Sequence, residues 1–370
     1  MNFFTKLRML LSSLYFLSSG GRFNYIFFSE KKNYKYYFLP LINKISSIKN
    51  NKIIYLSTDI EDRIDIASVK NLYIGEGFLR MIALNLVKGK FFFMTTTDLG
   101  NNEIKKTKNI DHYVYIFHSL QSIHKIYTEG AFNNYDIICC NGNYQLEELK
   151  KTEDVYKLKK KQFIKSGYLY LEYLKNNLNF HEKNESVLFA PSWNYNEKNL
   201  FDKYALSFLD HLLKNNLKVI FRPHPEHYKR SKKIINKVEK EYKNNKNFLL
   251  DANISNLESL NKSNILITDF SGIAQEFLFV FKKPIIIVKD LQKIHNQNYK
   301  KISDNTYEDE VYRKFGYFIN SENFYNLTNE IESAKLEFEN KKKYLEDFIN
   351  KSIFNNKSPS EIIYNELLKY

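Results

Sequence analysis

The chain has 370 residues, a length that predicts two domains, and 43% of its residues are hydrophobic, which is too many for a disordered chain. Lysine and arginine number 56 against 42 aspartates and glutamates, so the formal net charge is +14. This excess favours an anionic partner: nucleic acid, a phospholipid surface or a phosphorylated substrate. The only cysteines, Cys139 and Cys140, are adjacent, which excludes a disulfide framework and favours a reducing compartment.

Residues 1–20 are predicted to form an amphipathic helix. Lys6 and Arg8 precede a short apolar run in which leucines and phenylalanines recur at helical spacing. The uncharged stretch from Met9 to Ser19 is too short to span a bilayer, which takes about 20 apolar residues. Two roles stay open: the helix packs on the first domain, or it lies in the interface of an anionic membrane.

The first half of the chain alternates short apolar strands with polar or helical stretches. This rhythm is typical of a parallel sheet with helices on its faces. The predicted strands are residues 52–57, 71–74, 90–95, 112–118 and 135–141, and the predicted helices are residues 79–87, 121–127 and 144–161.

A second alternating unit follows a boundary zone at residues 162–184. Its predicted strands are residues 186–190, 217–222, 265–268 and 284–288, and its predicted helices are residues 200–215, 227–246 and 272–281. The fold class is therefore α/β, with two Rossmann-like, doubly wound domains facing a cleft. We expect a first domain over residues 1–165, a second over 166–335, and a helical tail over 336–370 that packs back.

The segment Arg222-Pro223-His224-Pro225 directly follows an apolar strand. In open α/β sheets ligands bind beyond the carboxyl ends of strands, so this position favours function. An arginine can hold phosphate oxygens in a two-pronged way, and a histidine between two prolines can donate to phosphate or carry a proton. The alternative is a structural Arg222 and a capping His224.

A second segment, Thr268-Asp269-Phe270-Ser271-Gly272, follows a strand and opens a helix. The free backbone N–H groups of a helix start attract anions, and Gly272 allows a phosphate to approach closely. Thr268 and Ser271 add hydroxyl donors, and Glu276 could accept the hydroxyls of a ribose. The alternative is an ordinary N-cap at Ser271 with a surface Glu276.

Three further segments end predicted strands or open a domain. His118, in Phe117-His118-Ser119, suits a general base near neutral pH, and a structural, hydrogen-bonded histidine is the alternative. For His124 the structural role is the favoured interpretation. Ser192, in Ala190-Pro191-Ser192-Trp193, could touch phosphate. Gly167, in Ser166-Gly167-Tyr168, permits close backbone approach between the domains.

Common nucleotide and hydrolase motifs are missing from the sequence. It has no Walker A loop, no Gly-x-Gly-x-x-Gly, no His-Glu-x-x-His and no Gly-x-Ser-x-Gly. No Asp-x-Asp pair stands in a loop that would obviously hold a divalent metal with a nucleotide. We therefore expect metal-independent handling of a nucleotide, with no cofactor.

Taken in order, these segments resemble the CDP-glycerol glycerophosphotransferase family, the teichoic acid primases and polymerases. Phe221-Arg222-Pro223-His224-Pro225 and Ile267-Thr268-Asp269-Phe270-Ser271-Gly272 carry the most specific part of the resemblance. The resemblance implies the GT-B fold, with the nucleotide mainly in the second domain and the acceptor mainly in the first. The chain departs from the family pattern at Phe117 and Ser119, where Trp and Gly are usual.

The resemblance also implies roles for individual residues. His118 would be the catalytic base, and His224 would lie near the transferred phosphate. Ser119, His124 and Gly167 would support the acceptor side. The residues implied around the donor are Arg222, Ser192, Thr268, Ser271, Gly272 and Glu276.

The leading hypothesis is transfer of glycerol phosphate, or a related polyol phosphate, from a CDP-alditol donor, with release of CMP. The expected acceptor is a glycan, a polyol phosphate or a lipid-linked molecule in capsule or cell-surface polymer synthesis. The alternative is a GT-B glycosyltransferase that uses a nucleotide sugar in capsule or lipopolysaccharide synthesis. Nucleic-acid binding is disfavoured, because the basic residues are dispersed rather than gathered in one stripe. The expected location is the cytoplasm, with contact to the inner face of the membrane.

Overall fold

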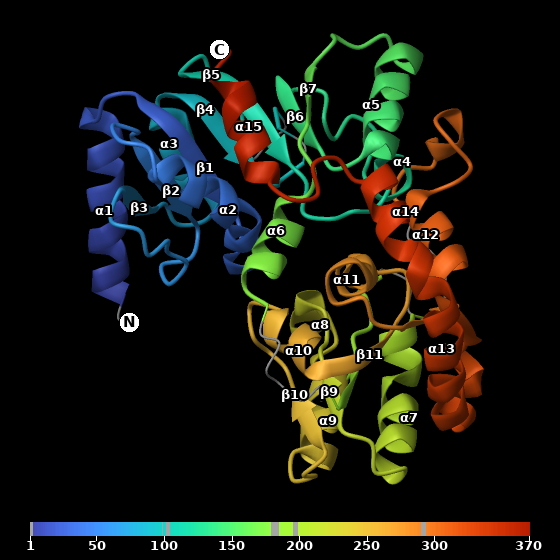
Figure 1. Ribbon diagram of the computed structural model, residues 1–370. Coiled ribbons are helices and arrows are strands. Elements are labelled where there is room, and N and C mark those ends of the chain that lie inside the picture. The colour runs from blue at the N-terminus through green and yellow to red at the C-terminus, as the bar shows by residue number, and fades with distance from the viewer. Residues whose placement is uncertain (1–2, 98, 101–103, 179–184, 195–198, 290–293) are drawn as a thin grey trace.

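The computed structural model describes residues 3–97, 99–100, 104–178, 185–194, 199–289 and 294–370. Within these ranges two sheets, each built from parallel strand pairs, lie at opposite ends of the molecule (Figure 1). The first sheet has the order β3-β2-β1-β4-β5-β6-β7. Its strands are β1 (Phe23–Ser29), β2 (Ile53–Ser57), β3 (Val69–Tyr73), β4 (Gly89–Met94), β5 (Ile110–Ile116), β6 (Ile137–Cys140) and β7 (Gln162–Lys165).

The second sheet has the order β10-β9-β8-β11-β12-β13. Its strands are β8 (Ser186–Phe189), β9 (Val219–Phe221), β10 (Phe248–Leu250), β11 (Ser263–Thr268), β12 (Ile285–Lys289) and β13 (Tyr317–Asn320). In each sheet the strand order reverses beside the first strand, between β1 and β4 and between β8 and β11. Ligands of doubly wound sheets bind at this switch point, beyond the carboxyl ends of the strands.

Helices pack on the faces of both sheets and bury apolar clusters against them. Those associated with the first sheet are α1 (Phe3–Ser19), α2 (Lys35–Ser46), α3 (Gly77–Leu86), α4 (Ile123–Ile126), α5 (Asn143–Val155) and α6 (Leu169–Asn176). The remaining helices are α7 (Leu200–Lys214), α8 (Pro225–Arg230), α9 (Lys232–Tyr242), α10 (Leu257–Lys262), α11 (Gly272–Glu276), α12 (Tyr307–Phe315), α13 (Leu327–Lys341), α14 (Leu345–Ser352) and α15 (Pro359–Leu367).

The two-sheet arrangement confirms the predicted α/β class, but the pattern along the chain missed the central strand of the first sheet. β1 pairs with β2 on one side and β4 on the other. Its residues Ile26, Phe27 and Phe28 are fully buried, because helices cover both faces of the sheet. A strand buried on both faces has no alternation of apolar and polar residues, so period-2 reasoning does not detect it.

The amino-terminal helix packs on the first domain with only one of its faces. Leu10 and Leu17 of α1 are buried on the side that contacts α3 and β3. Phe4 and Tyr15 are 77% and 74% exposed on the other side. Packing on the domain therefore accounts for only one of the two apolar sides of α1.

The carboxyl-terminal segment returns from the second domain to the first, where α15 packs against α2 and α6 (Figure 1). The backbone N–H of Phe354 donates to the carbonyl of Asn141 at 2.9 Å. Gly167 permits the crossing: its φ is +89°, and a Cβ at this position would lie 2.0 Å from the Phe354 carbonyl oxygen. Because the first sheet ends with β7, we propose that the domain boundary lies between residues 165 and 166, with α15 on the surface of the first domain.

Tyrosines fill the junction between the domains. Tyr37 of α2 and Tyr170 of α6 have ring centroids 4.5 Å apart. Tyr168 donates its hydroxyl hydrogen to Glu276 Oε1 at 3.2 Å, and Asn256 Nδ2 donates to Glu276 Oε2 at 3.1 Å. Glu276 is thus a buried carboxylate at the junction, 5% exposed, rather than a surface residue.

We expect Gly167→Ala to lower the free energy of unfolding by about 1–3 kcal/mol or more, because the new Cβ meets a backbone carbonyl and a positive φ disfavours alanine. Chemical denaturation measures this loss. Gly21→Ala is the matched control, since nothing lies within 4 Å of a Cβ there. Equal stability of the two variants would show that the backbone of Phe354 does not pack closely against residue 167.

We expect Glu276→Gln to change how stability depends on pH. Burial raises the pKa of Glu276 from 4.5 to about 7, although Asn256, Tyr168 and Arg222 oppose the shift. Between these two values the native chain holds more protons than the unfolded chain, so the free energy of unfolding falls as pH rises. The variant lacks this fall, and its stability relative to wild type should grow from about pH 5 to about pH 8.

Denaturation curves at a series of pH values measure this effect. Glu258→Gln on α10 serves as the control, because that side chain is 57% exposed. A constant difference between Glu276→Gln and wild type across the pH range would contradict the assignment of a buried carboxyl group with a raised pKa.

Candidate active site

Two loops, one from each domain, meet in the cleft between the sheets. The first follows β5 and carries His118 and Ser119, and the second joins β11 to α11. A Cβ built on Gly272 would lie 3.1 Å from Ser119 Oγ. Gln121 Nε2 donates to the carbonyl of Phe270 at 3.5 Å. The fold thus brings together two segments that the sequence singles out separately.

The loop after β5 is held by side-chain amides from the first domain. Asn141 Nδ2 donates to the Ser119 carbonyl at 2.9 Å, and Gln145 Nε2 donates to the Gln121 carbonyl at 3.2 Å. Ser119 Oγ accepts a hydrogen bond from the Gln121 backbone N–H at 3.1 Å. Ser119 therefore shapes the loop and also faces the second domain.

His118 is set among three tyrosines. Its ring centroid lies 5.3 Å from that of Tyr34, 6.2 Å from Tyr37 and 6.3 Å from Tyr127. Desolvation lowers the pKa of His118 to about 4; the nearby charge of Lys31 acts in the same direction, and the backbone of Thr95 opposes it. The imidazole is therefore neutral at pH 7, the form that can accept a proton.

His224 is the N-cap of α8, so the capping role left open by the sequence is observed. Its Nδ1 accepts a hydrogen bond from the Glu226 backbone N–H at 3.2 Å, and its own backbone N–H donates to His227 Nδ1 at 3.1 Å. Because Nδ1 of a neutral ring accepts here, the ring proton lies on Nε2, which can donate to an anion. Capping and phosphate binding use different nitrogens and are compatible.

His227 accepts a hydrogen bond from the backbone N–H of His224, and the sequence did not single it out. Its buried ring stacks on Phe201, with centroids 3.7 Å apart and planes 10° from parallel. The i,i+3 spacing of the two histidines across a proline is the signal of a capping box.

Arg222 is engaged within its own domain. Its guanidinium forms an ion pair with Asp251 and donates to the Asn253 carbonyl at 2.9 Å. The side chain is only 13% exposed. The contact of Arg222 with a diphosphate stays a prediction, and it would require the guanidinium to share or exchange these partners.

Ser192 and Thr268 also make internal hydrogen bonds rather than facing the cleft with free hydroxyls. The backbone N–H and Oγ of Ser192 donate to Asp269 at 2.8 and 2.9 Å. Thr268 Oγ1 donates to the Ala190 carbonyl at 2.6 Å. These bonds join the ends of β8 and β11 at the switch point, and the contact of the two hydroxyls with a phosphate stays a prediction.

Ser271 and Gly272 are half-buried at the start of α11. The Ser271 side chain makes no capping hydrogen bond, and its carbonyl accepts one from the Tyr312 hydroxyl at 2.8 Å. The helix predicted at residues 272–281 is observed, with its second half, Phe277–Phe281, as a π-helix. The turn before α11 therefore faces the cleft, whereas the carboxylate of Glu276 has both oxygens engaged by Tyr168 and Asn256.

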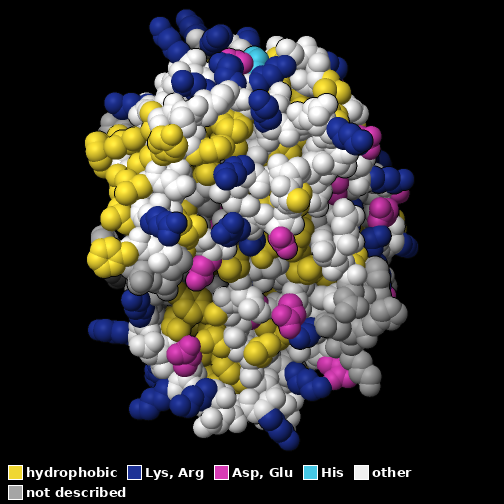
Figure 2. Space-filling view, turned by 90° about the vertical axis from the view of Figure 1, so that its left-hand side faces the viewer, with side chains coloured by type: hydrophobic (Ala, Val, Ile, Leu, Met, Phe, Trp, Pro, Cys, Tyr) yellow, Lys and Arg dark blue, Asp and Glu magenta, His cyan; other side chains and the backbone are white. Residues whose placement is uncertain are grey.

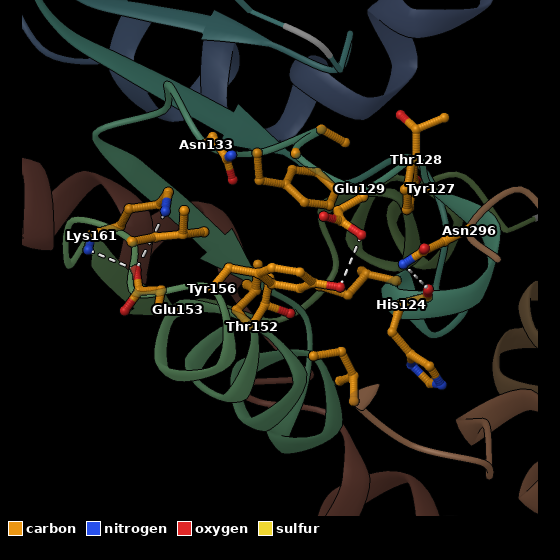
Figure 3. Close-up of a pocket in the computed structure, with 17 residues that line it drawn as sticks. His124, Tyr127, Thr128, Glu129, Asn133, Thr152, Glu153, Tyr156, Lys161 and Asn296 are labelled. Atoms are coloured by element: carbon orange, nitrogen blue, oxygen red, sulfur yellow. Dashed lines mark hydrogen bonds and ion pairs between the residues drawn. The ribbon is translucent and has the colours of Figure 1, made fainter. Parts of the chain in front are cut away.

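His124 lies outside the cleft. Its backbone lines a small cavity of about 40 Å³ beside Tyr156 and Glu129, and Figure 3 shows its ring directed away from these two residues. The ring is fully buried, with Nδ1 3.2 Å from Glu148 Oε2. The structural alternative for His124 thus fits the geometry. Gly167 lies where the carboxyl-terminal segment crosses to the first domain. The atoms nearest to a Cβ at this position belong to Phe354 and Pro359, not to the cleft loops.

Lys31 was missed by sequence reasoning. It lies two residues after the end of β1, at the switch point of the first sheet, and its Nζ lies 3.1 Å from Glu226 Oε1 of the second domain. Its charge also contributes to the low pKa of His118. The lysines that begin two residues after the apolar run 23–29 were the available signal, and this signal depended on recognising that run as a strand.

No group of three or more His, Cys, Asp or Glu side chains that could hold a metal ion occurs among the described residues. Cys139 and Cys140 are free and buried in β6. Burial raises the pKa of both thiols, so neither is set up as a nucleophile.

Comparison of the whole model with solved structures shows the fold. The wall teichoic acid polymerase TagF superposes with a TM-score of 0.65 at 14% identity, over 100% of this chain and 99% of that one. A putative UDP-N-acetylglucosamine 2-epimerase from Listeria monocytogenes has a TM-score of 0.60 at 8% identity, over 93% of this chain and 95% of that one. The S. aureus protein MnaA, solved with UDP, has a TM-score of 0.59 at 12% identity, over 94% and 96% of the two chains. The predicted GT-B fold is confirmed.

Comparison at the level of sequence identifies the family. No curated protein sequence matches the chain. The family model of CDP-glycerol:poly(glycerophosphate) glycerophosphotransferases matches residues 133–369, which is well over half of the chain and includes the His224 and Gly272 segments. The chain therefore belongs to the CDP-glycerol:poly(glycerophosphate) glycerophosphotransferase family.

Proposed function

We propose that this protein transfers glycerol phosphate, or a related polyol phosphate, from a CDP-alditol to a polyol-phosphate or glycan acceptor of a cell-surface polymer, such as a teichoic acid or capsule. The observation that carries the proposal is the meeting of the His118 loop with the turn before α11, where Gly272 and Ser119 face each other across the cleft. A neutral histidine from one domain and a nucleotide-binding switch point from the other then lie at one site.

In the proposed reaction the acceptor hydroxyl gives its proton to His118. The acceptor oxygen forms a bond to the outer phosphorus of the donor, while the bond from that phosphorus to the bridging oxygen breaks. CMP leaves with the electron pair of that bond. The protein's main contributions are positioning the two substrates and neutralising charge, as in other phosphoryl transfers.

Positive charge for this step would come from several groups at the cleft. His224 would donate through Nε2, the turn at Gly272 would offer backbone N–H groups, and Lys31 would add a full charge. Asp269, Asp251 and Ser192 would act indirectly by fixing the strand ends. We include metal independence in the proposal, and undiminished CMP release in the presence of a chelator would support it.

We further propose that the acceptor is reached at a membrane surface, on the inner face of the cytoplasmic membrane. The outward face of α1 exposes Phe4, Leu11 and Tyr15, and the adjoining start of α3 exposes Phe78 by 72%. Figure 2 shows apolar side chains gathered on this side of the molecule with lysines and arginines among them. Lys6 and Arg8 of α1 are exposed, and the helix carries no acidic residue. An apolar stripe with basic neighbours fits the interface of an anionic bilayer.

No helix among the described residues is long and apolar enough to cross a membrane.

We expect His118→Ala and His224→Ala each to lower the rate of CMP release from CDP-glycerol by a factor on the order of 10² or more, because each removes a proton-handling group at the reacting phosphorus. His211→Ala on α7, where the ring contacts Thr328, is the matched control and should stay near wild type. Near-normal turnover in both cleft variants would refute the assignment. Release of a nucleoside diphosphate with sugar transfer would instead support a glycosyltransferase.

We expect the double variant Phe4→Ser, Leu11→Ser to bind vesicles containing phosphatidylglycerol about tenfold or more weakly than wild type, since two large apolar side chains no longer enter the interface. Co-sedimentation measures the binding. Leu336→Ser, at a residue of α13 that is 73% exposed, removes an apolar side chain elsewhere and should have no effect. Equal binding by all three proteins would contradict a membrane role for α1.

A further inference from the structure

One ion pair bridges the cleft between the two histidines. Lys31 comes from the end of β1 in the first domain, and Glu226 comes from the first turn of α8 in the second, with 3.1 Å between Nζ and Oε1. Lys31 is close enough to His118 to influence its pKa. The backbone N–H of Glu226 donates to His224 Nδ1. The pair therefore connects the immediate surroundings of both candidate catalytic groups.

Glu226 is held by three cations at once. Besides Lys31, Arg230 Nε lies 3.2 Å from Oε2 and Lys229 Nζ lies 3.6 Å from Oε1. The carboxylate is 14% exposed, whereas the side chains of Lys31, Lys229 and Arg230 are 45%, 65% and 57% exposed. Burial opposes ionisation, but the hydrogen bond and charge of Lys31, with help from Arg230 and Lys229, lower the pKa of Glu226 to about 2.

Among the described residues, Lys31, Lys229 and Arg230 share the single carboxylate of Glu226. A carboxylate and a phosphate present the same chemistry to lysine and arginine, namely negative oxygen acceptors that take charge-assisted hydrogen bonds. Lys31 of this cluster acts on the pKa of His118, whereas Arg222 is paired with Asp251 within its own domain.

We propose that Lys31, Lys229 and Arg230 form a phosphate-binding site at the mouth of the cleft, and that Glu226 occupies the place of the phosphate until a substrate arrives. The substrate class rests on the proposed function. A phosphate of this kind has two sources, the diphosphate of the donor and the phosphodiester of a polyol-phosphate acceptor. On binding, the phosphate takes Lys31 from Glu226, which brings the cation to the reacting centre beside His118.

A purely structural role for the cluster makes a different prediction. Exposed ion pairs contribute little to stability, and a structural pair that is broken changes the free energy of unfolding without changing affinity for anions. A placeholder carboxylate competes with the ligand, so its removal tightens anion binding. The sign of the change in affinity for Glu226→Gln therefore separates the two roles.

The test is calorimetric titration of the full chain at low ionic strength with three probes: CDP-glycerol, a short glycerol-phosphate oligomer and pyrophosphate. We expect Glu226→Gln to bind pyrophosphate about threefold or more tightly than wild type, and Lys31→Met to bind it about tenfold more weakly. Lys32→Met is the matched control, because this neighbouring lysine pairs with Asp59 and Glu61 within the first domain. Thermal melting checks that each variant is folded.

The titrations with CDP-glycerol and with the glycerol-phosphate oligomer identify the source of the phosphate. Changes with CDP-glycerol alone assign the site to the donor, and changes with the oligomer alone assign it to the acceptor. Unchanged or weaker pyrophosphate binding by Glu226→Gln overturns the proposal, as does an equal loss in Lys31→Met and Lys32→Met. Wild-type protein that fails to bind CDP-glycerol would refute the proposed function, while the pyrophosphate arm still decides on the site.

Discussion

The approach of Ser119 to Gly272 is the contact on which the site depends. Each of these residues lies just beyond the end of a central parallel strand in its own sheet, and a side chain at residue 272 would have to fit 3.1 Å from the serine hydroxyl. Parallel sheets direct all their carboxyl ends to one edge, so two such edges facing each other concentrate polar loops in a narrow space. The division of roles that we propose follows from this geometry: the first domain supplies a proton acceptor, and the second supplies anion-binding groups.

Contacts elsewhere in the molecule hold the two domains in the arrangement that brings Ser119 and Gly272 together. The carboxyl-terminal segment crosses from the second domain to the first and is fixed there by the Phe354–Asn141 hydrogen bond and by α15. The tyrosines around Glu276 fill the junction from the other side. Within the second domain, Asp269 and Asp251 hold the ends of β8, β9 and β11 through Ser192 and Arg222. Several polar residues near the cleft thus fix the loops that surround it.

The sequence predicted the parts of the structure that local patterns determine. Short apolar runs marked most strands, and the segments around His118, His224 and Gly272 were recognised because each follows a strand. The pattern did not reveal β1, which is buried on both faces, and therefore did not reveal Lys31 at its end. Nor could spacing show that Arg222, Thr268 and Ser192 make internal hydrogen bonds, since Asp251, Ala190 and Asp269 come from other segments. Burial of Glu276 likewise depends on Tyr168 and Asn256, which only the folded chain brings together.

A crystal structure of the chain with CDP-glycerol would test the central claim most directly. The account predicts the nucleotide at the carboxyl ends of β8 and β11, with the outer phosphorus between the imidazoles of His118 and His224 and an oxygen of the diphosphate near the backbone N–H of Gly272. A nucleotide bound elsewhere, or an outer phosphorus out of reach of both histidines, would contradict it.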